Sequence, residues 1–315
     1  MTEEIQDLTS IKIITADDPW CLLLFLFQRN SAGLIPGGKA VQDLRERLMS
    51  IDPQLLLLCL LVGAIHLIST LSYGIRIAGV RTGRLAFSLA LFNVLVLCSR
   101  SSNAILAPLL SKRVELSITD GSWTGPGDFR VLLLAASLAT VFGAFLIPSC
   151  QRIVTAAVNR FESKPSMIAL ALAVAKPASW RFALGSLTLP AAANMSSIRF
   201  RGLPWGMFGM NILGIAFISC GVFSSLCAGH LAPQLRLTAG NLSALVNFMG
   251  TLLLFGFVDP HFSFVSDKVV SGQATEPYFR RCVTGMAASR VLGTLLAQVV
   301  LMPGAVAIAW VARKI

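Results

Sequence analysis

The stretch that decides the fold runs from Gln54 to Arg84 and reads "QLLLLCLLVGAIHLISTLSYGIRIAGVRTGR". Its apolar part is long enough to cross the hydrocarbon core of a bilayer, which takes about 20 residues of helix. Its middle nonetheless carries a histidine, hydroxyl side chains and a tyrosine, and three arginines follow. Polar residues are costly inside a membrane helix, so they indicate a bundle interior or a watery path and not a lipid-facing surface.

The composition of the whole chain also indicates a membrane protein. Of its 315 residues, 55% are hydrophobic and only 13% are charged, whereas soluble domains carry about 25% charged residues. A net charge of +11 would suggest nucleic-acid binding in a soluble protein. In a membrane protein, excess Lys and Arg are better explained by loops held at the cytoplasmic face, close to anionic headgroups. We therefore expect the membrane bilayer as a partner and no nucleic acid.

The apolar stretches predict an all-α, polytopic transmembrane helix bundle of about six spans. We expect the spans at about residues 54–79, 85–110, 131–148, 211–231, 237–258 and 283–311. The fifth span is expected to end at "VDPHFSF", where Pro260 closes the helix. Residues 51–315 are expected to form a single transporter domain. Residues 1–50 would be an N-terminal arm that is interfacial or poorly ordered.

A long basic segment, at about residues 151–210, separates the third and fourth spans. Its apolar runs, such as "MIALALAVA", are short, so we expect helices lying in the membrane interface, with a re-entrant pair as the alternative. The positive-inside rule makes this segment cytoplasmic, together with the turn at Arg81 and Arg84 and the connection that follows Asp259. Both termini would then lie outside, in a bacterial cytoplasmic (inner) membrane.

The polar residues inside the spans fall into stripes when they are placed at about 100° per residue. On the first span, His66, Ser69, Thr70 and Tyr73 share one face, and Arg76 lies at its edge. Similar stripes occur on the second, fifth and sixth spans. The candidate substrate-binding residues are therefore His66, Tyr73, Arg76, Asn93, Arg100, Asn103, Asn247 and Arg290.

Each candidate also has an ordinary structural explanation. Arginines near a helix end snorkel to the membrane surface, and His and Asn side chains commonly hydrogen-bond neighbouring helices together. The arginines, however, have no acid inside the expected spans, and the nearest is Asp259 at an expected helix end. Guanidinium groups suit phosphate oxygens. We therefore expect lipid headgroups or an anionic substrate to complete them.

The sequence lacks the motifs of the enzyme classes considered. "GLIPGGKA", residues 33–40, has Ala40 where a phosphate-binding loop needs Ser or Thr to hold magnesium. Neither G-x-S-x-G nor H-E-x-x-H is present. The seven Cys form no CxxC pair, and the three His form no cluster with acids. We expect a transporter without catalytic residues, metal or cofactor.

Three long blocks of the sequence resemble one bacterial family. They read "HLISTLSYGIRIAGVRTGRLAFSLALFNVLVLCSRSSNAILAPLL", "RLTAGNLSALVNFMGTLLLFGFVDPHFSFVSDKVVSG" and "FRRCVTGMAASRVLGTLLAQ". Together they resemble the Amj-type alternate lipid II flippases, and the likeness covers about residues 55–303. The chain departs from the family pattern at Ser69, where an acidic residue is expected, and in "SRSSN", where "SRTSN" is commoner.

The resemblance implies an activity but no agreed set of functional residues. The expected activity is translocation of lipid II, the undecaprenyl-pyrophosphate-linked peptidoglycan precursor, from the inner to the outer leaflet of the cytoplasmic membrane. A lipid-linked anionic substrate is the expected partner. Two alternatives remain open: an exporter of another anionic or polyprenyl-linked lipid, and a non-transporting membrane scaffold for cell-wall enzymes.

Overall fold

The computed structural model describes residues 52–122, 125–163, 176–188 and 202–315. No strand occurs in these parts of the chain, and nearly every residue in them is helical. Six helices are long and apolar enough to cross a membrane. The fold is therefore the expected all-α polytopic bundle. The N-terminal arm, residues 1–50, lies outside the described residues.

The first three long helices are α3 (Pro53–Thr82), α4 (Leu85–Thr119) and α5 (Gly127–Ser163). A short helix, α7 (Pro177–Gly185), precedes α9 (Trp205–Leu231). The next span is built of pieces, namely η2 (Pro233–Leu235), α10 (Arg236–Asn241), α11 (Ser243–Leu253), the π-helical η3 (Leu254–Val258) and α12 (Asp259–Val270). The chain ends in α13 (Glu276–Lys314).

Local signals fix where α3 begins and ends. Asp52 caps its first turn by accepting a hydrogen bond from the backbone N–H of Gln54 at 2.9 Å, and Pro53 occupies the first helical position. At the other end Gly83 adopts a φ of 69°, a left-handed conformation that glycine tolerates and that terminates the helix. Arg84 then leads into α4, so only a tight turn separates the first two spans.

Two expectations about helix ends are corrected by the structure. The chain does not stop at Pro260: it continues without a break from η3 into α12 as far as Val270. The proline lies in the first turn of α12, where a missing N–H is tolerated because of the π-helical segment before it. The segment 151–210 is also shorter than expected, because α5 continues to Ser163 and α9 begins at Trp205. Of this segment, α7 is the one separate helix among the described residues.

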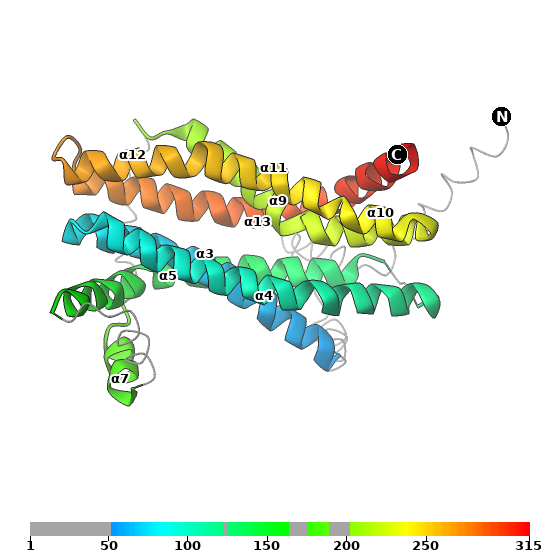
Figure 1. Cartoon of the computed structure of the whole chain (residues 1–315), viewed down its shortest axis with the longest axis horizontal. Helices are drawn as coiled ribbons and strands as arrows, with labels where there is room; N and C mark the ends of the chain where they lie inside the picture. Colours follow the sequence, from blue (N-terminus) through cyan, green and yellow to red (C-terminus); the bar gives the residue numbers. More distant parts are fainter. Residues whose placement is uncertain (1–51, 123–124, 164–175, 189–201) are drawn as a thin grey trace, which may run out of the picture.

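The six spans form two groups of three, here called the first half (α3, α4, α5) and the second half (α9, α10–α12, α13). The two halves occupy the lower and upper parts of Figure 1. In each half the first helix lies at the centre: α3 packs on α4 and α5, and α9 packs on α11 and α13. The chain runs in opposite directions along α3 and α9, so the halves have opposite orientations in the membrane.

One close helix contact has the same form in both halves. A Cβ placed on Gly143 of α5 would lie 3.0 Å from the Cβ of Thr70 on α3, and one on Gly293 of α13 would lie 2.7 Å from the Cβ of Ile215 on α9. Glycine lets the backbones approach closely at these points. The third helix of each half is therefore set against the first by a glycine near its middle.

Connections and helix ends gather at the two ends of the bundle. The α3–α4 turn, the end of α5 and the α12–α13 connection lie together at the left of Figure 1. We call this the basic end, because it carries Arg81, Arg84, Arg160, Lys268 and Arg280. The start of α3, the α4–α5 connection and the C-terminus lie at the opposite end, here called the far end.

Candidate functional site

Two apolar clusters pack the halves together, one toward each end of the bundle. The far cluster draws on Leu58 of α3, Leu132 of α5, Phe223 of α9 and Leu301 of α13, with their buried neighbours. The basic-end cluster draws on Tyr73 of α3, Ile147 of α5, Met207 of α9, Phe262 of α12 and Met286 of α13. Each cluster includes residues of both halves, so each closes the bundle at its own level.

Polar side chains occupy the level between these clusters, and we call this level the polar layer. Its members come from four helices and lie between the two clusters along each helix. They are His66, Ser69 and Thr70 of α3, Ser137 and Thr140 of α5, Asn211 and Ser219 of α9, and Ser289, Arg290 and Thr294 of α13. The apolar clusters thus leave a polar level across the centre of the membrane-spanning bundle.

Most groups in the polar layer are satisfied by hydrogen bonds to their own helices or a neighbour. Thr70 donates to the carbonyl oxygen of His66 at 2.7 Å, and Thr140 donates to that of Ala136 at 2.8 Å. Asn211 joins α9 to α13 by donating to the Ser289 hydroxyl at 2.7 Å. Such bonds are the usual use of small polar residues between membrane helices.

Three groups in the polar layer are buried without a hydrogen-bond partner among the described residues: the hydroxyl of Ser219 and one nitrogen on each of two ionisable side chains. The two nitrogens are Nδ1 of His66, whose residue is 8% exposed, and Nε of Arg290. The charge of Arg290 acts on the His66 imidazole, so the two side chains lie within electrostatic reach across the halves. At 1.5 Å per residue, Arg290 lies about 21 Å along α13 from Glu276, and His66 about 24 Å along α3 from Thr82. They therefore share one depth, near the membrane centre.

A buried polar group without a partner costs about 1–3 kcal/mol, and more if it is charged. Two such groups at the same depth in the membrane favour a ligand that supplies acceptor oxygens. A diphosphate offers several, and guanidinium N–H groups bind phosphate oxygens well. The pair of His66 and Arg290 is our candidate functional site.

Arg76 differs from the expectation of a guanidinium without an acid. Its Nη2 donates to Oδ1 of Asp259 on α12 at 2.6 Å, and its side chain is 9% exposed. Its guanidinium also lies over the rings of Phe92 on α4, at 4.7 Å, and Phe262 on α12, at 5.0 Å. The expectation was wrong for Arg76 because the helix continues past Pro260 and brings Asp259 into the bundle.

The sequence did not predict that Asp259 pairs with Arg76, because "VDPHFSF" was interpreted as the end of a span. The position of the carboxylate in the sequence could have indicated this pairing. An acid next to an uninterrupted apolar run is expensive in a membrane unless it has a partner, and a buried arginine is the natural one. The two residues are 183 positions apart, so spacing gave no hint.

The remaining candidates are dispersed. Tyr73 packs edge-to-face on Phe262, with ring centroids 6.4 Å apart. Asn247 on α11 lies against α9, close to Gly221, and its Oδ1 is buried without a hydrogen-bond partner. Asn93 and Asn103 are exposed on α4. The side chain of Arg100 lies outside the described part of the structure. The candidates thus do not all converge on one point.

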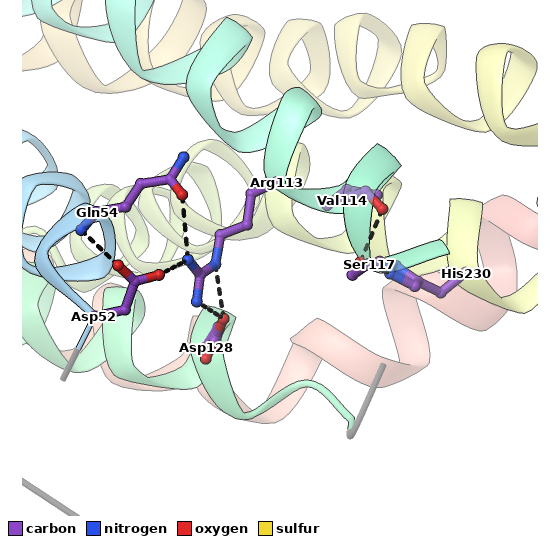
Figure 2. Close-up of polar contacts among 7 residues, drawn as sticks. All are labelled: Asp52, Gln54, Arg113, Val114, Ser117, Asp128 and His230. Atoms are coloured by element: carbon purple, nitrogen blue, oxygen red, sulfur yellow. Dashed lines mark hydrogen bonds and ion pairs between the residues drawn. The ribbon is translucent and has the colours of Figure 1, made fainter. Parts of the chain in front are cut away.

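The two halves are joined differently at the two ends. At the basic end, Arg81 of α3 donates to Glu276 of α13 at 2.8 Å, in addition to the Arg76–Asp259 pair. At the far end, two hydrogen bonds between neutral groups join described residues of the halves: Ser117 of α4 is 2.7 Å from Nε2 of His230 on α9, and Gln298 donates to the Arg130 carbonyl oxygen at 3.1 Å. Figure 2 shows the first of these far-end contacts.

Figure 2 also shows a cluster that ties the first half together at the far end. Arg113 of α4 donates to Asp52, the cap of α3, and to Asp128 in the first turn of α5, at 2.8 Å. The hydrogen bond and charge of Arg113, followed by the hydrogen bond from the Gln54 backbone, hold the pKa of the Asp52 carboxyl below its usual range. The cluster joins three helix ends of one half and does not bridge the halves.

A surface pocket of about 370 Å³ lies at the basic end. It is lined by residues 83–87, which form the α3–α4 turn and the start of α4, and by Val158 of α5. None of the eight candidate residues lines it. Among the described residues, no group of three or more His, Cys, Asp and Glu side chains is placed to hold a metal ion.

The comparisons with known proteins come to the same family as the sequence blocks. The family model described as Amj, "Alternate to MurJ", matches residues 61–312. The chain is also 33% identical to the lipid II flippase Amj of Bacillus subtilis (strain 168) over 260 residues, which is 82% of this chain and 96% of that protein. The chain belongs to the Amj family. No solved structure matches it.

Membership of the Amj family agrees with the architecture. The matched region begins within α3 and ends within α13, so it includes all six spans and the polar layer. The family-model match starts at residue 61, after the N-terminal arm. The chain is therefore a multi-pass protein of the bacterial cytoplasmic membrane and belongs to a family of membrane transporters and not of enzymes.

Proposed function

We propose that this protein moves lipid II from the inner to the outer leaflet of the cytoplasmic membrane, and that residues 51–315 act as one transport unit. The relative in Bacillus subtilis is named a lipid II flippase. The observation that supports the proposal is the presence of two buried nitrogens without a hydrogen-bond partner, Nδ1 of His66 and Nε of Arg290, at mid-membrane between two apolar clusters.

The physical obstacle in this task is the headgroup. The polyprenyl tail stays in lipid, but the diphosphate must lose its water, which costs far more than one hydrogen bond returns. The polar layer offers replacements at the depth where the loss is greatest. Arg290 would bind diphosphate oxygens with charge-assisted hydrogen bonds, and His66 would add a donor or acceptor to the headgroup.

The apolar clusters would keep water and ions from following the headgroup. Only one cluster needs to open at a time, which gives the headgroup access to the polar layer from one leaflet and exit to the other. The positive-inside rule assigns the basic end to the cytoplasm, so the cluster that contains Tyr73 and Phe262 would open first. Tyr73 would then line the path, and Asn247 would line it beyond the polar layer.

The first prediction tests this function in cells depleted of their other lipid II flippase. Wild-type protein should restore exposure of the precursor at the outer leaflet. Arg290→Gln should lower that rate by about tenfold or more, because it removes a charge-assisted hydrogen bond. The measurement is precursor accessibility to an externally added cleaving enzyme, at equal protein level.

Arg280→Gln is the matched control, because Arg280 lies on the same helix but is exposed and paired with Glu276. It should keep the wild-type rate. Wild-type rates in Arg290→Gln combined with His66→Gln would remove these residues from the mechanism. Failure of the wild-type protein itself to expose the precursor would favour export of another anionic polyprenyl lipid, or a scaffold role, over the proposed function.

A further inference from the structure

The Arg76 guanidinium is held in a fixed place but is incompletely bonded. The rings of Phe92 and Phe262 lie at 4.7 and 5.0 Å from it, so aromatic faces of both halves keep it in position. Its recorded hydrogen bond is a contact between Nη2 and one oxygen of Asp259, and its Nε is buried without a partner. An arginine in this state can accept a better anion without moving.

Asp259 sits where its helix is easiest to deform. It follows the π-helical segment Leu254–Val258 directly, and Pro260 comes next. The π-helical segment and the proline both interrupt the regular i to i−4 hydrogen bonding, and kinks and movements concentrate at such places. The carboxylate is 29% exposed, so it can be reached from the side. The junction between α11 and α12 is therefore the place in this span where bending is easiest, and Asp259 is the first residue after it.

Two ion pairs between described residues join the halves at the basic end. Arg81–Glu276 is the more exposed pair, with both side chains about 41–42% accessible, and such surface pairs stabilise little. Arg76–Asp259 is the more buried one, and it lies next to the apolar cluster that closes this end. The stronger link between the halves on this side is therefore the Arg76–Asp259 pair.

We propose that the Arg76–Asp259 pair is the cytoplasmic gate, and that the diphosphate of the incoming lipid opens it by replacing the Asp259 carboxylate on Arg76. This rests on the proposed function and names the residue that couples substrate arrival to opening. A diphosphate can bond Nη2 and the unused Nε together, whereas Asp259 uses one oxygen. Once released, α12 swings about the π-helical segment and uncovers the path toward Arg290.

The second prediction measures the gate directly in the full-length protein in vesicles of phosphatidylethanolamine and phosphatidylglycerol. Spin labels on genetically encoded amino acids at Ala86 of α4 and Asp267 of α12 report the distance between the halves at the basic end, since both positions are exposed. The added probe is geranylgeranyl diphosphate, and the matched uncharged probe is geranylgeraniol.

In the wild type, the diphosphate should increase the population at longer distance, and the alcohol should leave it unchanged. Asp259→Asn should raise the ratio of open to closed protein about tenfold without any probe, the size expected for weakening a charge-assisted contact. Asp128→Asn is the control, because it weakens an ion pair confined to the first half. It should behave as the wild type.

A second variant covers the case in which Asp259→Asn fails to fold. Arg76→Asp combined with Asp259→Arg keeps the pair in reverse, so it should be as closed as the wild type without any probe. The gate is refuted if the wild-type distance ignores the diphosphate, or if Asp259→Asn stays as closed as the wild type. The lipid II assignment fails separately, if the distances respond as stated while wild-type protein exposes no precursor in cells.

Discussion

A single carboxylate determines how Arg76 is accommodated in the membrane. Without Asp259 the guanidinium would be a buried charge enclosed by Phe92 and Phe262. A lone charge at membrane depth costs several kcal/mol, which explains why the partner is present. Arg290 has no such recorded bond at its Nε, although it lies deeper. The two arginines therefore differ: Arg76 is paired with an acid of the protein, whereas Nε of Arg290 has no hydrogen-bond acceptor among the described residues.

The third prediction concerns Asp52 and the dependence of stability on pH. Its pKa is lowered in the folded protein, mainly by Arg113, from an unfolded value of about 3.9. The carboxylate therefore stabilises the fold at pH values above about 4, and this contribution is lost as the pH falls through the folded pKa. Unfolding temperature should accordingly be lower for Asp52→Asn than for wild type at pH 7.

That difference should shrink toward zero as the pH is lowered below 4, when the wild-type carboxyl becomes protonated. Thermal unfolding in detergent, followed by circular dichroism from pH 3 to 8, provides the measurement. Asp120→Asn, at the C-cap of α4, is a suitable control. A pH-independent gap between Asp52→Asn and wild type would show that the cap acts through shape and not charge.

At the scale of elements, hydropathy determines where the membrane-spanning helices lie in the sequence, and glycine determines where they pack closely. Each expected span lies within one helix except the fifth, which covers α10, α11 and η3. Most helices run past the expected ends, for example α5, which spans Gly127–Ser163. The extra turns contain polar and basic residues, as in "SKRVELSIT" at the end of α4. A hydropathy limit marks where the lipid ends, whereas a helix ends where its caps are, so the two need not coincide.

The fourth prediction tests glycine packing in α13. A methyl group at Gly293 would lie 2.8 Å from the Ile212 carbonyl oxygen and 2.7 Å from the Ile215 Cβ, both on the adjacent α9. The α9 backbone cannot easily move away from the added methyl group, so Gly293→Ala should lower the free energy of unfolding by about 1–3 kcal/mol. Gly209→Ala on α9 meets nothing within 4 Å and should be neutral or slightly stabilising. The readout is unfolding in mixed micelles, and equal effects of the two variants would contradict the packing argument.

At the scale of the molecule, two three-helix halves with opposite directions form one bundle. The arrangement resembles the inverted-topology repeats of many transporters, in which the substrate site lies at the repeat interface near the bilayer midplane. His66 of the first half and Arg290 of the second occupy that position here. The sequence shows no strong repeat, so the correspondence rests on packing. In each half the first helix packs against both the second and the third.

The fifth prediction fixes the orientation of this assembly in the cell. Ser122, in the α4–α5 connection at the far end, and Gln273, between α12 and α13 at the basic end, are both exposed. The positive-inside rule places the basic end in the cytoplasm. A membrane-impermeant maleimide added to intact cells should therefore label Ser122→Cys and not Gln273→Cys, with native cysteines blocked or replaced. The reverse pattern would invert the proposed direction of transport.

The sequence by itself determined that the chain is a six-span helical membrane protein of this family. Hydropathy and the three family-like sequence blocks are local properties that can be read without a structure. The sequence also placed His66 and Tyr73 on one helix face, with Arg76 at its edge, because helical periodicity is local too. Only the tertiary structure decided which of the polar residues meet. His66 and Arg290 are brought to one level by the packing of α3 and α13, and Arg76 is paired with a residue 183 positions away. Such pairings depend on how whole helices dock, and nothing in the spacing of residues along one helix encodes the partner helix.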